Sequence, residues 1–327
     1  MSAAESNKDR DLVVGLGATG LSIARYLQRN DANAIFYDSR EEPPGLDELE
    51  ALFDGPELHL ANERMPKGVT RVIASPGVPE SNKLLKKARK KKLEVISDIE
   101  LFARAAEAPF IAVTGSNGKS TVTTLLYHMC RAAGKETLAG GNLGMPALDL
   151  LAEETPDIYV LELSSFQLQR TLSLPAEVAL LLNISPDHLD WHTNEDEYRE
   201  SKYRIFREAH AAVVNRADEI AIERSAHCGR VISFGLDAPE DGHYGIREEE
   251  GDKYLARGDV LLLAVRDLAL YGVHNQLNAL AALAAGELIG LDQGAMLQGR
   301  VECPGLPHRM QSVARIGGVR AATASSL

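Results

Sequence analysis

The sequence predicts an α/β protein with two parallel-sheet domains. Short apolar runs alternate with longer amphipathic stretches along most of the 327 residues, which is typical of repeated strand–helix units. Two of these runs end in glycine-rich loops that open a helix, at residues 15–20 and 115–118. Such loops lie at the carboxyl ends of parallel strands, where phosphate groups bind. The length agrees with two or three domains.

Composition limits the classes of function. Hydrophobic residues make up 45% of the chain and charged residues 25%, which is enough to bury real cores. A net charge of -12 argues against a dedicated nucleic-acid binder. The polar N-terminus and the lack of a long apolar run predict neither a signal peptide nor a membrane span. Three widely spaced cysteines, Cys130, Cys228 and Cys303, favour neither zinc nor disulfides. We expect a cytoplasmic monomer with small-molecule partners.

The first block of elements covers residues 11–98. Residues 11–20 predict a strand, a glycine turn and the start of a helix. Residues 33–38 predict a second strand that ends in Asp38, and residues 69–79 a third strand with its loop. Residues 83–92 carry seven basic side chains. These predict the solvated face of a helix, with a phosphate-steering patch as the alternative.

The second block begins near residue 108. Residues 108–121 predict a strand, a glycine loop and a helix start. Further strands are expected within residues 156–165, 176–188, 211–218 and 230–235. Helices are expected at residues 194–209 and 272–290. The alternation predicts a second parallel sheet.

The segment TGSNGKST, residues 114–121, is the strongest signal in the chain. Its glycines let backbone amides point inward, and the following helix start adds roughly half a positive charge. Lys119 can reach the β- and γ-phosphates of ATP, and the Ser120 hydroxyl can bind Mg²⁺. The spacing is shorter than the usual phosphate loop, which would have glycine where Val113 stands. The alternative is a tight turn with an accidental lysine. The predicted ATP-binding residues are Gly115, Ser116, Asn117, Gly118, Lys119, Ser120 and Thr121.

Polar residues follow two later strands. Glu162 lies in an apolar run, where a carboxylate is costly unless it is paired or binds a metal. Either it holds Mg²⁺, or it faces solvent at the strand end. His188, in the segment DHLD, follows another strand, so topology predicts that it joins Glu162 and the phosphate loop. The alternative is a loop-capping cluster. Lys202 alone reads as an ordinary helix lysine.

Ten segments in one order give a family resemblance: GLGATGLS, ASPG, SDIELF, TGSNGKST, GGNLG, LELSSFQL, NISPDHLD, YRESKYRIF, GVHNQLNA and GLPHR. Over residues 11–320 the chain resembles the Mur ligases, and SDIELF and LELSSFQL resemble their D-glutamate-adding branch. The resemblance implies that ATP phosphorylates the carboxylate of UDP-N-acetylmuramoyl-L-alanine in peptidoglycan precursor synthesis. The amine of D-glutamate would then attack the acyl phosphate.

The resemblance also assigns chemistry. Lys119, Lys202 and His188 would be catalytic. Ser120 and Glu162 would hold one Mg²⁺, while His188 and Lys202 would help to hold a second. Lys202 matches the family lysine that CO₂ carbamylates, which converts a cation of pKa about 10.4 into an anionic oxygen ligand.

Substrate contacts are implied in the same way. In the first block the glycine turn from Gly15 to Gly20 would meet the diphosphate, and the ends of the second and third strands would meet the rest of the uridine nucleotide. Asn142 would contact the sugar-peptide part. The helix start at residue 274 would read adenine, with plain helix capping as the alternative, and Arg309 would also contact the nucleotide. The remaining positions are Gly17, Ala18, Thr19, Asp38, Ser39, Ser75, Pro76, Gly77, His274, Asn275 and Asn278.

The expected domains are residues 1–98 for the UDP-substrate, 99–303 for ATP and ligation, and 304–327 as a remnant of a third domain. Family members continue after GLPHR into a domain with a DSKATN-type motif, which is not found here. Residues 310–320 predict a strand, a Gly-Gly turn and a return strand, and a lone hairpin is marginal in water. We therefore expect residues 304–327 to be mobile or loosely docked, and ligation to be impaired.

Other interpretations stay open. One is a catalytically inactive protein that binds a UDP-sugar and ATP. Another is a different Mur-type or folylpolyglutamate-type amide ligase, which UDP binding would distinguish because folate ligases lack such a nucleotide-sugar domain. An NAD-dependent oxidoreductase, based on Gly15, Gly17 and Gly20 alone, leaves the ATP-type loop unexplained.

Overall fold

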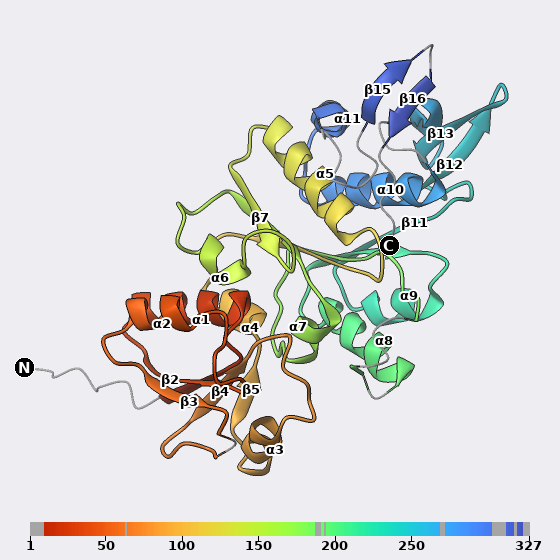
Figure 1. Ribbon diagram of the computed structural model, residues 1–327. Coiled ribbons are helices and arrows are strands. Elements are labelled where there is room, and N and C mark those ends of the chain that lie inside the picture. Colours follow the sequence, from red (N-terminus) through yellow and green to blue (C-terminus); the bar gives the residue numbers. More distant parts are fainter. Residues whose placement is uncertain are drawn as a thin grey trace, which may run out of the picture. The chain divides into compact units, whose positions relative to one another are not determined.

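The computed structural model describes residues 10–62, 64–186, 191–192, 194–268, 272–302, 312–316 and 319–322, with side chains up to residue 299. The chain forms two compact units (Figure 1). The N-terminal unit comprises the residues up to 106 together with 144–154 and 165–173. The central unit comprises 107–143, 155–164 and the residues from 174 onward. Two segments that lie far along the chain therefore fold as part of the N-terminal unit.

A five-stranded parallel sheet forms the N-terminal unit, in the order β3-β2-β1-β4-β5. Its strands are β1 (Arg10–Val14), β2 (Asn33–Asp38), β3 (Glu57–Leu60), β4 (Arg71–Ala74) and β5 (Glu94–Ile96). Its helices are α1 (Ala18–Arg29), α2 (Leu46–Leu52), α3 (Lys83–Lys90), α4 (Asp98–Ala105), α6 (Ala147–Leu150) and α7 (Ser165–Gln169). The predicted strands β1, β2 and β4 are confirmed, and the strand order reverses between β1 and β4, where ligands bind in such sheets.

Helix α3 shows how the basic run of residues 83–92 folds. The Asn82 side chain accepts hydrogen bonds from the amides of Leu84 and Leu85 and caps the helix, as helix starts require. Leu84, Leu85 and Ala88 are buried, while the basic side chains are exposed. The predicted solvated helix face is confirmed.

The central unit contains a nine-stranded sheet in the order β14-β13-β12-β11-β10-β9-β6-β8-β7. The strands from β7 to β12 run parallel, and β12, β13 and β14 form an antiparallel extension. Its parallel strands are β6 (Phe110–Thr114), β7 (Thr137–Gly141), β8 (Ile158–Glu162), β9 (Val178–Leu181), β10 (Ala211–Asn215), β11 (Arg230–Phe234) and β12 (Tyr244–Glu249), followed by β13 (Asp252–Arg257) and β14 (Val260–Ala264). The sequence did not predict the antiparallel strands.

Helices α5 (Lys119–Ala132), α10 (Val273–Leu288) and α11 (Gln293–Glu302) pack against one another (Figure 1). Helix α10 is buried almost all round from Asn278 to Gly286, because its alanines allow close approach on several sides. Helices α8 (Glu195–Tyr203) and α9 (Glu219–Ser225) complete the unit. The predicted α/β fold with two parallel sheets is confirmed.

The predicted C-terminal hairpin is present as β15 (Ser312–Ile316) and β16 (Val319–Ala322), which pair antiparallel. The loose docking of residues 304–327 stays a prediction, because most of these residues lie outside the described ranges. Among the described residues, no helix has the length and apolarity to span a membrane.

Candidate functional site

The phosphate loop joins the end of β6 at Thr114 to the start of α5 at Lys119. Gly118 adopts a left-handed conformation with φ of 85°. A Cβ atom at this position would lie 2.3 Å from Oδ1 of Asn278, so a larger residue would force the loop and α10 apart. The structure therefore brings the predicted loop and the predicted start of α10 together.

Two ammonium groups meet at one backbone carbonyl of this loop. Nζ of Lys119 donates to the Gly115 oxygen at 3.0 Å and to the Ser116 oxygen at 3.1 Å. Nζ of Lys202 donates to the same Gly115 oxygen at 2.9 Å. Lys202 is only 2% exposed, and its ammonium lies 4.9 Å from the centre of the Tyr198 ring. A protein of net charge -12 thus concentrates positive charge where an anionic ligand would bind.

Residues from two other segments hold the loop in place. Ser116 Oγ lies 2.8 Å from the Tyr198 hydroxyl and accepts a hydrogen bond from the Ser185 amide at 2.9 Å. The Asn117 amide donates to Oδ1 of Asn183 at 2.9 Å, and Nδ2 of Asn183 donates back to the Asn117 oxygen at 3.0 Å. The sequence interpretation missed Tyr198 and Asn183, although both lie in segments that carry the family resemblance. These contacts preorganise the loop for phosphate.

Glu162 is the last residue of β8 and pairs with Val113 of β6 and Gly141 of β7. Its side chain is 2% exposed, so the solvent-facing alternative does not hold. Oε1 accepts a hydrogen bond from Nδ2 of Asn142 at 2.9 Å. Oε2 is buried and has no partner among the described residues. A buried carboxylate oxygen is costly to leave without a partner, and oxygen ligands suit Mg²⁺, so the residues present fit that ion.

Of the other predicted metal ligands, the structure describes Ser120 but not His188. Ser120 is half-buried in the first turn of α5. His188, which the resemblance assigns to a second Mg²⁺, lies outside the described residues, as does Arg309. The second metal site and the contact of Arg309 with the nucleotide therefore stay predictions.

The start of α10 carries a chain of polar side chains that ends at the phosphate loop. Nδ2 of Asn278 donates to Oδ1 of Asn275 at 3.3 Å, and Nδ2 of Asn275 lies 3.1 Å from Nε2 of His274. The two asparagines are each 6% exposed, whereas His274 is exposed. This arrangement suits a polar ligand that lies beside the loop.

In the N-terminal unit, three strand ends converge on the glycine turn. A Cβ atom at position 20 would lie 1.9 Å from the Gly15 oxygen, so the turn requires Gly20. Ser75, after β4, donates from Oγ to that Gly15 oxygen at 2.8 Å. Asp38, at the end of β2, accepts a hydrogen bond from the Leu16 amide at 2.7 Å. The predicted substrate residues Gly15, Gly20, Ser75 and Asp38 thus come together.

Asp38 is held by charge as well as by the turn. Burial raises the pKa of its carboxyl, but hydrogen bonds from Arg40 and the Leu16 amide, with the charge of Arg40, lower it below its usual value overall. Arg40 was not foreseen from the sequence; it donates from Nε and Nη2 at 2.8 Å each. The same hydrogen bonds that lower the pKa favour the ionised carboxylate, which stabilises the turn.

The rest of the predicted substrate set lies around this turn. Gly17 caps α1 without a side-chain hydrogen bond, which leaves the amides at the helix start open to an anion. The other members are exposed or half-buried: Ala18, Thr19, Ser39, Pro76 and Gly77.

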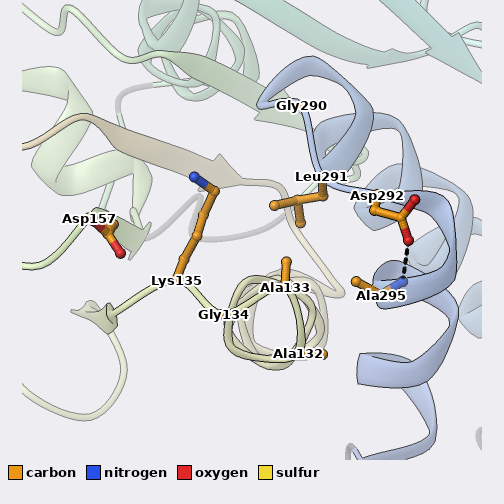
Figure 2. A pocket seen from close by; sticks show the side chains of 9 residues that line it. All are labelled: Ala132, Ala133, Gly134, Lys135, Asp157, Gly290, Leu291, Asp292 and Ala295. Atoms are coloured by element: carbon orange, nitrogen blue, oxygen red, sulfur yellow. Dashed lines mark hydrogen bonds between the residues drawn. The ribbon is translucent and has the colours of Figure 1, made fainter.

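A hollow of about 660 Å³ lies at the other end of α5 (Figure 2). Ala132 and Lys135 line it from the helix end, and Leu291 and Asp292 from the segment before α11. Since α5 runs 14 residues from Lys119 to Ala132, this hollow lies roughly 20 Å from the phosphate loop. It belongs to neither cluster of predicted site residues.

Comparisons with known proteins agree with this organisation. The family model described as "Mur ligase MurD-like, N-terminal domain" matches residues 9–97, and the "Mur ligase middle domain" matches residues 113–286. The chain is 45% identical to UDP-N-acetylmuramoylalanine–D-glutamate ligase of Legionella pneumophila (strain Paris), over 94% of this chain and 70% of that protein. The corresponding ligase of Pseudomonas syringae pv. syringae is 44% identical over 98% and 71%.

Solved structures show the same fold at low sequence identity. UDP-N-acetylmuramate:L-alanyl-gamma-D-glutamyl-meso-diaminopimelate ligase from Neisseria meningitides has a TM-score of 0.60 at 17% identity, covering 91% of this chain and 99% of that chain. UDP-N-acetylmuramate-alanine ligase from Thermotoga maritima has a TM-score of 0.57 at 20% identity, covering 97% and 74%.

Proposed function

The chain belongs to the Mur ligase family, and we propose that it joins D-glutamate to UDP-N-acetylmuramoyl-L-alanine with conversion of ATP to ADP and phosphate. The observation that carries the proposal is that the side-chain nitrogens of Lys119 and Lys202 both reach the Gly115 carbonyl of the phosphate loop. The identity of 45% to curated D-glutamate ligases supports this substrate pair over a folylpolyglutamate-type reaction.

The chemistry brings two anions together. A carboxylate oxygen of the nucleotide substrate attacks the γ-phosphorus of ATP, the bond to ADP breaks, and an acyl phosphate forms. The amine nitrogen of D-glutamate then attacks the acyl carbon, and phosphate leaves as the amide forms. Lys119 and the loop amides would neutralise charge on the transferred phosphoryl group. The rigid hold of Tyr198 and Asn183 on the loop would keep these donors in place.

Magnesium would be held by Ser120 and Glu162, and it would neutralise phosphate charge as a Lewis acid. The buried Oε2 of Glu162 supports this assignment. Lys202 is buried beside the loop, and we propose that it is the carbamylated lysine of the family. His188 would join it at a second Mg²⁺.

The N-terminal unit would bind the uridine diphosphate. Amides at the start of α1 would meet the phosphates, with Ser75 and Asp38 fixing the turn below them. On the central unit, Asn142 would contact the sugar-peptide part and the start of α10 would read adenine. We place the protein in the cytoplasm as a monomer in peptidoglycan precursor synthesis.

The test separates binding from turnover. Calorimetry with UDP-N-acetylmuramoyl-L-alanine and with Mg²⁺-ATP measures each binding site, and ADP release with and without D-glutamate measures ligation. Release that depends on D-glutamate, and that is lost in Lys119→Met, is the expected result. Its rate tests the impaired ligation expected from the sequence, which stays a prediction. Binding of both ligands without turnover would instead favour the catalytically inactive interpretation. No binding of the UDP-substrate would reject the proposal.

A further inference from the structure

Arg170 is a fully buried arginine of the N-terminal unit, 2% exposed. It belongs to residues 165–173, which follow β8 in the chain but fold with the N-terminal unit. Its guanidinium donates from Nη1 to the Ser75 oxygen at 3.0 Å, from Nη2 to the Val78 oxygen, and from Nε to Oε1 of Glu80 at 2.8 Å. One planar side chain thus binds three acceptors along a single loop, residues 75–80.

This loop supports the glycine turn. Ser75, whose carbonyl Arg170 binds, donates from its hydroxyl to the Gly15 oxygen at 2.8 Å. Val78 packs beside the same turn, because a Cβ atom at Gly15 would lie 2.8 Å from its Cγ2. Two of the three residues that Arg170 binds, Ser75 and Val78, therefore have side chains that lie against Gly15.

The segment that carries Arg170 is itself fixed to α4. Nε2 of Gln167 donates to Oδ2 of Asp98 at 3.0 Å, and the Ser97 and Thr171 hydroxyls lie 3.0 Å apart. The Leu172 and Ser173 amides donate to Oε2 of Glu100 at 2.6 and 2.8 Å. These bonds lie on both sides of Arg170 in the sequence and give its guanidinium a rigid base.

A buried arginine contributes little to the stability of a fold, because apolar residues of similar size often stabilise it equally well or better. Its planar guanidinium can, however, donate to two loop carbonyls and a carboxylate in one fixed geometry, which an apolar side chain cannot do. We propose that Arg170 is a positioning residue for the nucleotide-sugar substrate. It holds residues 75–80 so that Ser75 and Val78 keep the glycine turn in its phosphate-binding shape. This inference rests on the proposed function of that turn.

The test compares two ligands on one protein. Arg170→Met should weaken binding of UDP-N-acetylmuramoyl-L-alanine at least tenfold in calorimetry, and change the dissociation constant of Mg²⁺-ATP less than twofold. Arg170→Lys keeps the positive charge beside Glu80 but not the planar guanidinium, and it should recover part of the lost affinity for the UDP-substrate. The matched control is Arg71→Met. Arg71 also binds a buried partner, Asp11, through two hydrogen bonds, but it lies at the start of β4, whereas the glycine turn and Ser75 follow the ends of β1 and β4. Arg71→Met should leave UDP-substrate binding unchanged.

The outcomes are distinct. If the parent protein does not bind the UDP-substrate, the result contradicts the proposed function, on which the inference rests, and is distinguishable from a failure of the role of Arg170. If the parent binds and Arg170→Met binds equally well, Arg170 has no positioning role. An equal loss in Arg71→Met, or a parallel loss of Mg²⁺-ATP binding, would show general destabilisation and overturn the inference. If Arg170→Met does not fold, Arg170→Lys decides by the same ratio of the two dissociation constants.

Discussion

Two buried glutamates of this chain differ in how their oxygens are satisfied. Glu100, 1% exposed, accepts hydrogen bonds from the Leu172 and Ser173 amides, the Ser173 hydroxyl and Arg104. Burial raises its pKa, but these bonds outweigh burial and lower the pKa overall. Glu162 is equally buried, yet only Asn142 donates to it and Oε2 lacks a partner among the described residues. The first carboxylate is therefore structural, and the second is available for a cation.

Glu162→Gln tests this difference. Removing the charge should raise the Mg²⁺ concentration needed for half-maximal ATP binding at least tenfold, because a neutral amide is a poor Mg²⁺ ligand. Without metal, the variant should melt at or above the parent temperature, since an uncompensated buried charge is removed. Glu100→Gln is the control and should lower the melting temperature with no change in Mg²⁺ dependence. A destabilised Glu162→Gln with normal Mg²⁺ dependence would show a structural glutamate.

Asp98 makes stability depend on pH. Its side chain is 2% exposed, and burial raises its pKa from 3.8 to about 6, against the hydrogen bond from Gln167, the amides of Asp98 and Ile99, and the charge of Arg170. The folded state therefore holds the proton more tightly than the unfolded chain. The resulting stability is present below pH 3.8 and is lost as pH rises to about 6, which amounts to about 3 kcal/mol.

Asp98→Asn should therefore be more stable than the parent at pH 8 by several degrees in melting temperature, because asparagine cannot ionise and still accepts from Gln167. The gain should fall to roughly half at pH 5, where the folded parent is mostly protonated. Differential scanning calorimetry at both pH values measures this. A gain of the same size at both values would mean that ionisation of Asp98 is not its cause.

At the residue scale, the sequence revealed groups whose chemistry is unusual for their position. Glu162 stands out in an apolar strand, and Lys119 stands out after a glycine loop. Tyr198, Asn183 and Arg170 do not stand out, because their roles depend on contacts with residues 82, 66 and 95 positions away. No local spacing encodes such pairs. Buried strands were predictable from their apolar runs even when they are only four residues long, as β4 and β9 are. The edge strand β3 was missed because its residues are exposed or half-buried, and the edge strand β5 because it is only three residues long.

Helix α8 shows how one element serves the site. It carries Tyr198 and Lys202, which contact the phosphate loop at Ser116 and Gly115. Its start is capped by Asn194, whose side chain accepts the Glu197 amide at 2.8 Å. The acidic first turn of α8 adds to this because negative charge suits a helix N-terminus.

Asn194→Ala should cost about 1 kcal/mol of stability, and it should also weaken ATP binding severalfold, since a frayed α8 holds Tyr198 less firmly. Asn82→Ala is the matched control, because Asn82 caps α3 of the N-terminal unit in the same way. It should lower stability by a similar amount and leave ATP binding unchanged. Titration calorimetry and thermal melts give both quantities. Equal ATP affinities in the two variants would contradict the link between α8 and the loop.

The whole molecule consists of two units that each have their own hydrophobic core. One core gathers residues of β1, β2, β4, β5 and α3, such as Leu12, Ile35 and Leu84. The other gathers residues of the central sheet with α5, α10 and α11, such as Val113, Leu126 and Leu280. Because each core draws on one unit alone, each proposed ligand should stabilise the unit to which it binds.

Thermal unfolding can separate these effects, because the single tryptophan of the chain, Trp191, belongs to the central unit. Mg²⁺-ATP at 100 times its dissociation constant adds about 2.7 kcal/mol to the unit that binds it. It should therefore raise the midpoint temperature of the unfolding transition that Trp191 fluorescence reports by several degrees. UDP-N-acetylmuramoyl-L-alanine should mainly raise the midpoint temperature of the transition of the N-terminal unit, which circular dichroism detects and Trp191 fluorescence does not. Lys119→Met should abolish the first shift and keep the second. Equal shifts by both ligands in both signals would instead show that the two units unfold as one cooperative structure.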